Sequence, residues 1–251
     1  MAAAGIMDTI APEAYADWFG LDQLDAALAT ATNPLPPFKH CLKTGNATLI
    51  EQFNAGTDAT VLIHGRSWLV DQLLARAWQH FMGTAAEQLA LIAVGGYGRS
   101  ELMPGSDIDL LLLLPDTDNS QHAPDIEALI TFLWDIGLEV GHSVRTVSDC
   151  VEQSLADITV VTNLMEARLL SGSAGLFRQM QAATTPEHIW NSRDFFGEKC
   201  AEQRIRHKRF HDTAYKLEPN VKESPGGLRD IQMIAWVANR HFRTASLDDL
   251  V

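Results

Sequence analysis

The sequence predicts an α/β fold, in which a small mixed sheet is preceded and followed by helical segments. Two runs in the middle of the chain support a sheet. One is the apolar run "LALIAVGG", which ends in two glycines, and the other is the five leucines Leu110 to Leu114, typical of a strand buried on both faces. Outside these runs, apolar residues recur at helical spacing. We therefore expect a helical segment over residues 1–82, a sheet-containing core over 83–150 and a helical extension over 151–251.

The N-terminal segment is predicted to be helical from its apolar spacing. Residues 15–29 have a helical pattern that breaks at "NPLPPF" (residues 33–38), where two successive prolines indicate a linker or turn. A second helical stretch follows from about residue 48. Residues 66–81 then place their apolar side chains on one helix face, and Gly83 closes that helix.

The core is predicted to contain three strands and one helix. The first strand leads into the glycines Gly95 and Gly96, and the leucine run forms the second. Residues 123–137 read as an amphipathic helix that stops at a glycine, and residues 138–148 are the third strand candidate. From about residue 151 the pattern is mostly helical, with an interruption over residues 217–230.

Charge and composition exclude some classes of partner. The chain has 19 Lys and Arg against 32 Asp and Glu, which argues against a surface built mainly to bind nucleic acid. The local basic run at residues 204–209 favours the solvated face of a helix over a phosphate-binding stripe. The first residues lack the basic start of a secretory signal, and no apolar run approaches the roughly 18 residues of a membrane span. Three isolated cysteines fit a reducing cytoplasm, so we expect a cytoplasmic protein that binds neither nucleic acid nor membrane.

Two carboxylates at the head of the leucine strand indicate the chemistry. Asp107 and Asp109 are two residues apart on a strand, so they point to the same side. Neighbouring carboxylates repel each other, and a bound divalent cation would offset that repulsion. With the Gly95–Gly96 turn ten residues earlier, the pattern suits two-metal nucleotidyl transfer, in which the aspartates hold the metals and the turn cradles the phosphates. The alternative is a strand end with two solvated aspartates.

Neighbouring residues extend this hypothesis, and two other nucleotide motifs fail. Arg99 and Ser106 are close enough in sequence to add phosphate contacts. A dinucleotide-binding fingerprint is excluded because Glu101 stands where its third glycine belongs, and because a strand follows rather than a helix. The chain contains no GxxxxGK[ST] sequence, so it has no P-loop.

The pattern resembles the DNA-polymerase-β-like nucleotidyltransferases, and more narrowly the N-terminal catalytic region of the bacterial PII uridylyltransferase/uridylyl-removing enzymes. The resemblance covers roughly residues 45 to 250. It is carried by "GRSWLVDQLL", "AVGGYGRSELMPGSDIDLLLL", "LWDIGLEVGHSVRT", "EARLLSG" and "YKLEPNVKESPGGLRDIQ". Ser100 and Ser224 depart from the family, because glycine is expected at both positions.

The resemblance implies a reaction. UMP would be transferred from UTP to a tyrosine of the PII signalling protein with Mg²⁺, and Asp107 and Asp109 match the family's metal-binding pair. A third carboxylate is expected on a neighbouring strand; Glu139 is the candidate, although a solvated residue at a strand start is an equal alternative. Two other functions stay open. One is a related nucleotidyltransferase with another acceptor, and the other is a regulatory module that binds nucleotide without turnover.

The C-terminal part offers further candidates. Lys216, Lys222 and Arg229 surround "SPGG" and could supply charge to the UTP phosphates or contact the base; a rigid interhelical turn is the equal alternative. His211–Asp212 spells the HD dipeptide of metal-dependent phosphohydrolases, but its place in the family makes coincidence the better interpretation. Family members continue into HD and ACT domains, so we expect a truncated extension in which Ile231, Ile234 and Trp236 lack full packing.

Overall fold

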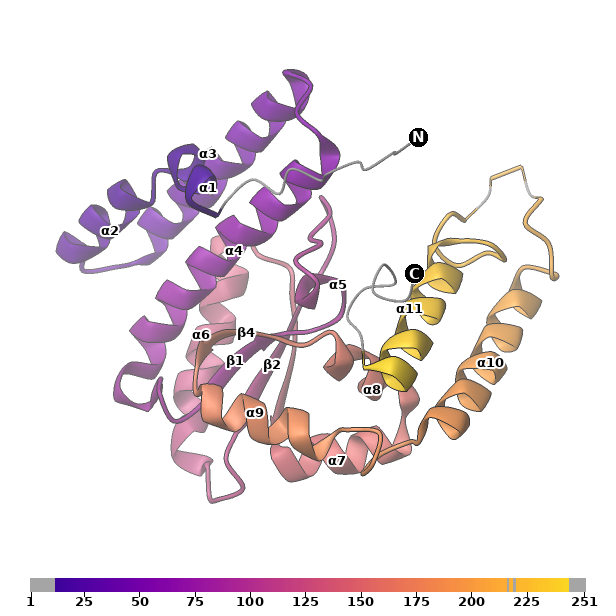
Figure 1. Cartoon of the computed structure of the whole chain (residues 1–251). Coiled ribbons are helices and arrows are strands. Elements are labelled where there is room, and N and C mark those ends of the chain that lie inside the picture. Colours follow the sequence, from indigo (N-terminus) through magenta and orange to yellow (C-terminus); the bar gives the residue numbers. More distant parts are fainter. Residues whose placement is uncertain (1–11, 216, 219, 244–251) are drawn as a thin grey trace. The chain divides into compact units, whose positions relative to one another are not determined.

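The computed structural model describes residues 12–215, 217–218 and 220–243 (Figure 1). Contacts divide the chain into two compact units. The first unit contains residues up to 146 together with 166–177, and the second contains 147–165 together with the residues from 178 onward. The division into three regions predicted from the sequence stays a prediction.

The first unit begins with four helices: α1 (Pro12–Phe19), α2 (Leu21–Thr30), α3 (Leu35–Asn54) and α4 (Ala59–Met82). The linker or turn predicted at residues 33–38 is confirmed only before Leu35, because α2 ends at Thr30 and α3 begins at Leu35 and includes both adjacent prolines. Asn33 Oδ1 accepts a hydrogen bond from the Leu35 N–H at 2.9 Å, and two prolines follow in the first turn. The backbone N–H groups of a first helical turn have no acceptor within the helix. Prolines, which lack this N–H group, are therefore tolerated there.

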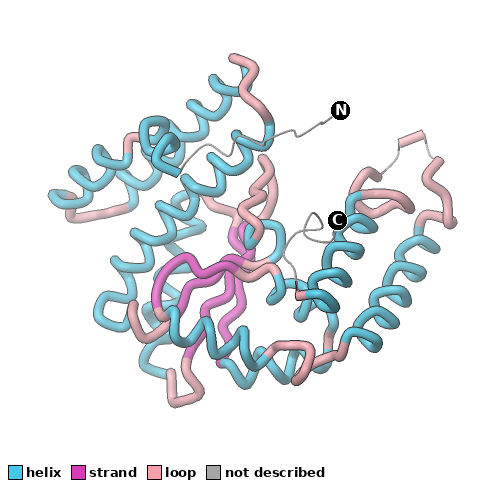
Figure 2. Tube along the Cα trace, viewed as in Figure 1, coloured by secondary structure: helices cyan, strands magenta, loops and turns pink. Residues whose placement is uncertain are grey.

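One four-stranded sheet forms the centre of this unit (Figure 2). Its strands are β1 (Ala90–Ala93), β2 (Ile108–Leu114), β3 (Val140–Thr146) and β4 (Arg168–Gly172), in the order β3-β2-β1-β4. β1 pairs antiparallel with β2 and β4, and β2 pairs parallel with β3. The sheet is therefore mixed, and the predicted α/β class is confirmed.

β4 corrects the prediction that the chain after residue 151 would be helical apart from the interruption at 217–230. This strand has five residues, all of intermediate exposure, and its sequence "RLLSG" has no regular alternation. Its strand conformation depends on pairing with β1, which lies more than seventy residues earlier in the chain, and not on a local pattern.

Short elements connect the strands. The four-residue helix α5 (Gly95–Gly98) follows β1, and α6 (Ala123–Ile136) joins β2 to β3. The 3₁₀ turns Gly83–Ala85 and Ser120–His122 precede β1 and α6. The predicted helix stop at Gly137 is confirmed, because this residue has φ 98° immediately after α6.

The leucine strand is buried on both faces, as predicted. All five leucines of β2 are at most 5% exposed. Leu110, Leu112 and Leu114 belong to a core cluster to which α4 and α6 contribute Leu73, Trp78, Leu129 and Leu133. Burying one such leucine contributes about 1.5–3 kcal/mol, so the strand that begins beside Asp107 is held firmly.

The second unit is helical. It contains α7 (Val147–Ala156), α8 (Ile158–Met165), α10 (Ser192–Arg209) and α11 (Leu228–Phe242), and α9 (Ala174–Ala183) crosses into it from the first unit. Its core cluster consists of apolar residues from the α8 to α11 segment: Val161, Ile189, Phe195, Met233 and Trp236. The predicted helix start at Leu228 is confirmed. The prediction that Trp236 lacks full packing was wrong, because it is 6% exposed and belongs to this core cluster, whereas Ile231 and Ile234 are 57% and 59% exposed.

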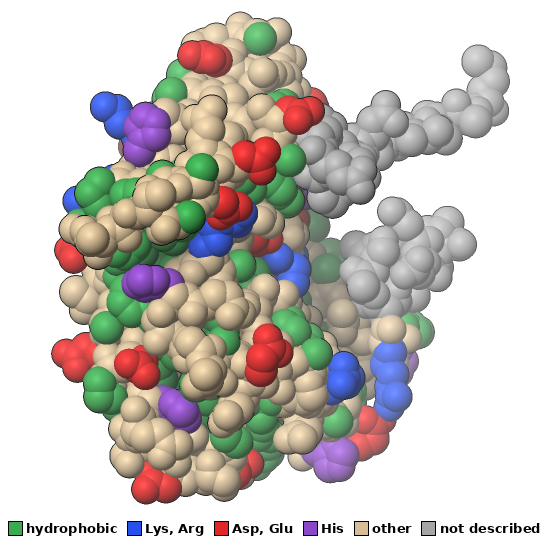
Figure 3. Space-filling model, turned by 90° about the vertical axis from the view of Figure 1, so that its left-hand side faces the viewer, with side chains coloured by type: hydrophobic (Ala, Val, Ile, Leu, Met, Phe, Trp, Pro, Cys, Tyr) green, Lys and Arg blue, Asp and Glu red, His purple; other side chains and the backbone are tan. Residues whose placement is uncertain are grey.

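The basic run at residues 204–209 is only partly the solvated helix face that the sequence predicted. It lies at the end of α10, but the Arg206 side chain is 7% exposed and pairs with Asp230 of α11. On the face drawn in Figure 3, Lys and Arg side chains are scattered among acidic and apolar ones. Within the part of the chain that the structure describes, no helix has the length and apolar character needed to cross a bilayer.

Candidate functional site

The two aspartates lie at the exposed start of β2. Asp107 directly precedes the strand and Asp109 is its second residue; both are exposed, whereas Leu110 and the residues after it are buried. Gly141 of β3 is paired with Asp109 in the parallel register. A Cβ atom at position 141 would lie 3.0 Å from Asp109 Oδ1, so the glycine leaves room beside that carboxylate. Gly141 was not singled out from the sequence.

The glycine turn between β1 and β2 uses its glycines for different reasons. Gly95 has φ 60°, in the left-handed region that favours glycine. A Cβ atom on Gly98 would lie 2.0 Å from the carbonyl oxygen of Glu166, so the fold itself requires glycine there. Gly96 differs, because a Cβ atom on it would meet no atom closer than 3.7 Å. Packing within the chain does not require glycine at position 96. Gly96 therefore remains a candidate for close approach of a ligand to the backbone.

The turn and the carboxylates meet at one end of the sheet. The Val94 N–H donates to the Asp109 carbonyl oxygen at 3.1 Å, immediately before the turn begins. The first N–H groups of α5 have no partner inside that helix, which makes them available to an anion. The structure thus brings together the two parts of the predicted nucleotide site, the glycine turn and the aspartate pair.

A polar cluster holds the turn in place, and it consists of residues to which the sequence analysis assigned no role. The buried Tyr97 hydroxyl donates to Asp71 Oδ1 of α4 at 2.5 Å. Arg168 of β4 binds the same carboxylate through two contacts of 2.7 and 3.1 Å. Its guanidinium also donates to the carbonyl oxygens of Gly98 and Tyr97, each at 3.3 Å. Burial, and then the Asp71 charge, raise the pKa of Tyr97 well above its usual value, so the phenol stays protonated and donates. We call Asp71, Tyr97 and Arg168 the turn clamp.

A second anchor holds the chain just after the turn. Ser67 of α4 is buried; its hydroxyl donates to the Ser100 carbonyl oxygen at 2.7 Å and accepts from the Leu102 N–H at 3.0 Å. Ser100 has φ 63°, a left-handed conformation. This explains why glycine was expected at position 100, since glycine adopts that conformation without steric cost.

Arg99 and Ser106 lie in the same loop but have other contacts in this structure. Arg99 Nη1 lies 2.5 Å from Glu166 Oε1, and its Nε donates to Glu101 at 2.8 Å. These carboxylates raise the pKa of Arg99 although burial alone would lower it. Ser106 is exposed, and its N–H donates to the Met103 carbonyl in the turn before Asp107. Their predicted phosphate contacts stay predictions.

Glu139 lies beside the aspartates in the strand register. It directly precedes β3, it is exposed, and its carbonyl oxygen accepts from the Ile108 N–H at 2.9 Å, which places it opposite Asp107. Among the described residues, no three His, Cys, Asp or Glu side chains converge closely enough to hold a metal ion. Two carboxylates still fit Mg²⁺, which usually binds one or two carboxylates together with substrate phosphates. Whether Glu139 is the third ligand stays a prediction.

Of the candidates in the second unit, Lys216 lies outside the described residues and Lys222 is exposed. Arg229 donates to Gln232 at 3.0 Å and to Glu223 at 3.4 Å, and its guanidinium lies 5.5 Å from the centre of the Trp236 ring. These contacts hold the start of α11. They do not test a role in binding UTP phosphates, which stays a prediction.

Asp230 organises the loop before α11. It accepts hydrogen bonds from Gln203 and from the Gly226 N–H, at 2.9 and 2.7 Å, and it also binds Arg206 and His207. Burial alone would raise the pKa of Asp230, but these hydrogen bonds lower it to about 2. The contacts are those of a rigid interhelical turn, one of the two interpretations considered for this loop.

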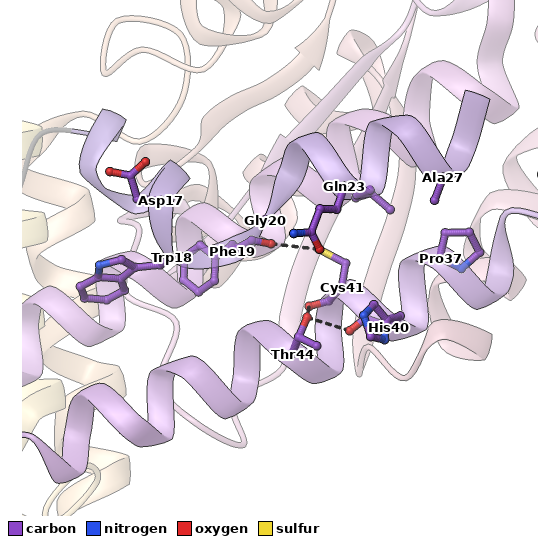
Figure 4. Close-up of a pocket in the computed structure, with 11 residues that line it drawn as sticks. Asp17, Trp18, Phe19, Gly20, Gln23, Ala27, Pro37, His40, Cys41 and Thr44 are labelled. Carbon is purple, nitrogen blue, oxygen red and sulfur yellow. Dashed lines mark hydrogen bonds between the residues drawn. The ribbon is translucent and has the colours of Figure 1, made fainter. Parts of the chain in front are cut away.

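A separate hollow lies among α1, α2 and α3, with a volume of about 320 Å³ (Figure 4). Two of its polar side chains are used in helix contacts: the Cys41 thiol lies 3.7 Å from the Phe19 carbonyl oxygen, and the Thr44 hydroxyl donates to the His40 carbonyl at 2.9 Å. These are structural contacts, and the hollow does not include the glycine turn or the aspartates.

Known families match two parts of the chain. The GlnD PII-uridylyltransferase model matches residues 194–251, and a nucleotidyltransferase model, DUF294, matches residues 44–143. Bifunctional uridylyltransferase/uridylyl-removing enzymes from Pseudomonas putida strain W619 and Azotobacter vinelandii strain DJ are each 48% identical, over 95% and 96% of the chain. The chain is similar to the uridylyltransferase/uridylyl-removing enzymes over nearly all of its length. It covers 27% of the length of each, so it spans about a quarter of the curated relatives that it matches.

The match to the uridylyltransferase/uridylyl-removing enzymes confirms the family resemblance predicted from the motifs. The nucleotidyltransferase model covers the glycine turn, both aspartates and Glu139. The uridylyltransferase model covers α11 and the loop before it. The candidate site therefore lies in the part of the chain that resembles nucleotidyltransferases, while the turn clamp also draws Arg168 from outside the matched range.

Proposed function

We propose that this chain transfers UMP from UTP to a tyrosine of a PII signalling protein with Mg²⁺, in the cytoplasm. The observation that carries the proposal is the exposed pair Asp107 and Asp109 beside a glycine turn that is clamped from α4 and β4. The substrate and the acceptor come from the names of the matching family and relatives, because fold alone does not select them.

The reaction is an in-line displacement at the α-phosphorus of UTP. The acceptor hydroxyl oxygen forms a bond to that phosphorus, the bond to the bridging oxygen of the β-phosphate breaks, and pyrophosphate leaves while the hydroxyl proton is released. Bound Mg²⁺ supplies positive charge that offsets the charge developing on the phosphate oxygens. Asp107 and Asp109 would hold it, and the N–H groups at the start of α5 would orient the triphosphate.

Neutralising either aspartate tests the proposal. Asp107→Asn and Asp109→Asn remove one negative charge each at exposed positions, so the fold should persist while transfer falls by about 100-fold or more. The assay incubates each protein with UTP, Mg²⁺ and PII and measures the mass of PII, with circular dichroism as the control for folding. Chelation of Mg²⁺ should give the same loss in the unsubstituted chain.

The outcomes separate the proposal from its two alternatives. PII that gains the mass of UMP supports it. Release of pyrophosphate without modification of PII would favour a related nucleotidyltransferase with another acceptor. UTP binding with neither product would favour a regulatory nucleotide-binding module, and near-normal transfer by Asp109→Asn would remove that residue from the site.

A further inference from the structure

Arg66 of α4 is a half-buried cation without a carboxylate partner among the described residues. Its Nη1 donates to Asn46 Oδ1 of α3 at 2.9 Å, and its Nε is buried with no hydrogen bond. Three other arginines of this unit do have a carboxylate partner. Arg76, Arg99 and Arg168 each contact a carboxylate at 2.5 to 2.7 Å. A partly desolvated guanidinium without an anion is costly, so Arg66 calls for a functional explanation.

An apolar groove opens beside Arg66. It has a volume of about 500 Å³ and lies between the end of α3, the start of α4 and the segment from Leu102 to Pro104. Its walls are apolar apart from Asn46 and Arg66. Ile50 and Phe53 of α3 both line this groove and are 62% and 68% exposed, so the groove presents a continuous apolar surface to solvent. The groove is of the size and composition of a binding site.

The groove is connected in sequence and in space to the candidate catalytic residues. Arg66 and Asn46 also line a second cavity of about 110 Å³, which is lined further by Gly105, Ser106 and Glu139. The segment from Leu102 to Ser106 therefore contributes to both cavities and runs directly into Asp107. Glu139 lies opposite Asp107 in the strand register.

We propose that this groove docks the acceptor protein. A segment of the acceptor near the modified hydroxyl would place an apolar side chain against Ile50 and Phe53 and a carboxylate on Arg66. Charge complementarity favours an acidic group, since Arg66 is the one charged side chain of the groove. Position favours the acceptor over an unrelated ligand, because the groove is walled by the segment that leads into the carboxylate pair. The inference rests on the function proposed above and adds the surface that selects the acceptor.

Two substitutions and a matched control test the docking surface. Phe53→Ser removes an exposed apolar side chain, and Arg66→Met removes the charge while keeping a long side chain. Phe196→Ser is the control, because Phe196 is an exposed phenylalanine, 50% accessible, on helix α10 of the second unit. The dissociation constant for fluorescently labelled PII is measured by anisotropy with Mg²⁺ and without UTP, together with KM for PII and KM for UTP.

We expect PII binding and KM for PII to weaken by about tenfold or more in Phe53→Ser and Arg66→Met, as for a residue at the centre of an interface. KM for UTP and the Phe196→Ser control should stay unchanged. Arg66→Lys should recover part of the loss, which a purely structural role would not predict.

The failures are distinguishable. Unchanged PII affinity in both groove variants, or no PII binding by the unsubstituted chain, would overturn the docking surface. PII binding through the groove without any transfer would uphold the surface and refute the proposed reaction. Equal loss of PII and UTP affinity would also overturn the inference, because it would show a general disturbance of the unit.

Discussion

Removing Asp71 should loosen the glycine turn. Asp71→Ala takes away the carboxylate that holds both Tyr97 and Arg168, whose contacts to it measure 2.5 to 3.1 Å. The Tyr97 hydroxyl would lose its acceptor while it stays buried, and the Arg168 guanidinium would lose its ion pair. Since Arg168 also donates to the Gly98 and Tyr97 carbonyl oxygens, the position of the turn itself depends on this cluster.

The structure sets the magnitude of the loss. Breaking a fully buried ion pair costs about 3–5 kcal/mol, whereas a surface pair is worth about 0–1 kcal/mol. The Arg168 and Asp71 side chains are 31% and 21% exposed, which places this pair between the two limits. The unsatisfied Tyr97 hydroxyl adds a cost of about 1–3 kcal/mol. With about 1–3 kcal/mol for the partly exposed pair, we expect a decrease of about 2–6 kcal/mol in the free energy of unfolding.

The assay compares Asp71→Ala with Asp25→Ala in urea unfolding and in calorimetric UTP binding. Asp25 of α2 also binds an arginine of α4 through two contacts, 2.6 and 2.8 Å to Arg76, but it is 53% exposed and lies away from the turn. The control should therefore lose about 0–1 kcal/mol of stability and keep its affinity for UTP. Asp71→Ala should bind UTP about tenfold more weakly, because a mobile turn must be ordered on binding.

Two results would refute this reasoning. Equal stability losses in the two variants would show that the turn clamp is energetically an ordinary surface pair. A large loss in Asp71→Ala with unchanged UTP affinity would show that the clamp stabilises the fold but does not position a nucleotide-binding turn.

Three further predictions concern single residues. Gly98→Ala should destabilise the protein strongly, because its Cβ would lie 2.0 Å from the Glu166 carbonyl oxygen, whereas Gly96→Ala should fold normally and weaken UTP binding; equal melting temperatures for the two would contradict this. Asp230 has a pKa of about 2, below its usual 3.8, so its contribution to stability should be present above about pH 4 and be lost as pH falls towards 2. Urea unfolding midpoints measured between pH 4 and pH 2 should depend less on pH in Asp230→Asn than in the unsubstituted chain. Glu139→Gln should reduce transfer and raise the Mg²⁺ concentration for half-maximal rate if Glu139 is the third ligand, and an unchanged Mg²⁺ dependence would exclude it.

Local patterns predicted the parts of the fold that local interactions determine. The leucine run indicated β2 because a strand buried on both faces has an apolar sequence of its own, and the Asp107–Asp109 spacing indicated its exposed start. The stop of α6 at Gly137 was equally local. The double proline misled, because prolines are tolerated in the first turn of a helix as well as in a linker, and here they follow the Asn33 contact to the Leu35 N–H at the start of α3.

Non-local pairing accounts for what was missed. β4 is a strand because it pairs with β1, and Arg168 reaches Asp71 across 97 positions of sequence. The role of Gly141 depends on the strand register, which places it beside the Asp109 carboxylate. Asp71, Gly141 and Arg168 all lie in segments that carry the family resemblance, but periodicity and spacing gave none of them a role.

Contacts within the chain explain the identity of some residues but not of others. Gly98, Ser67 and Asp230 satisfy contacts of the chain itself, and their identity follows from packing or hydrogen bonding. Gly96 has space for a side chain, and Arg66 lacks an anion among the described residues. Gly96 lies in the glycine turn, and Arg66 lines the small cavity that Ser106, Ile108 and Glu139 also line. Both residues therefore lie in the first unit, close to the start of β2 or to the turn that precedes it. Residues that the chain's own contacts do not explain are expected at a site selected for ligand binding.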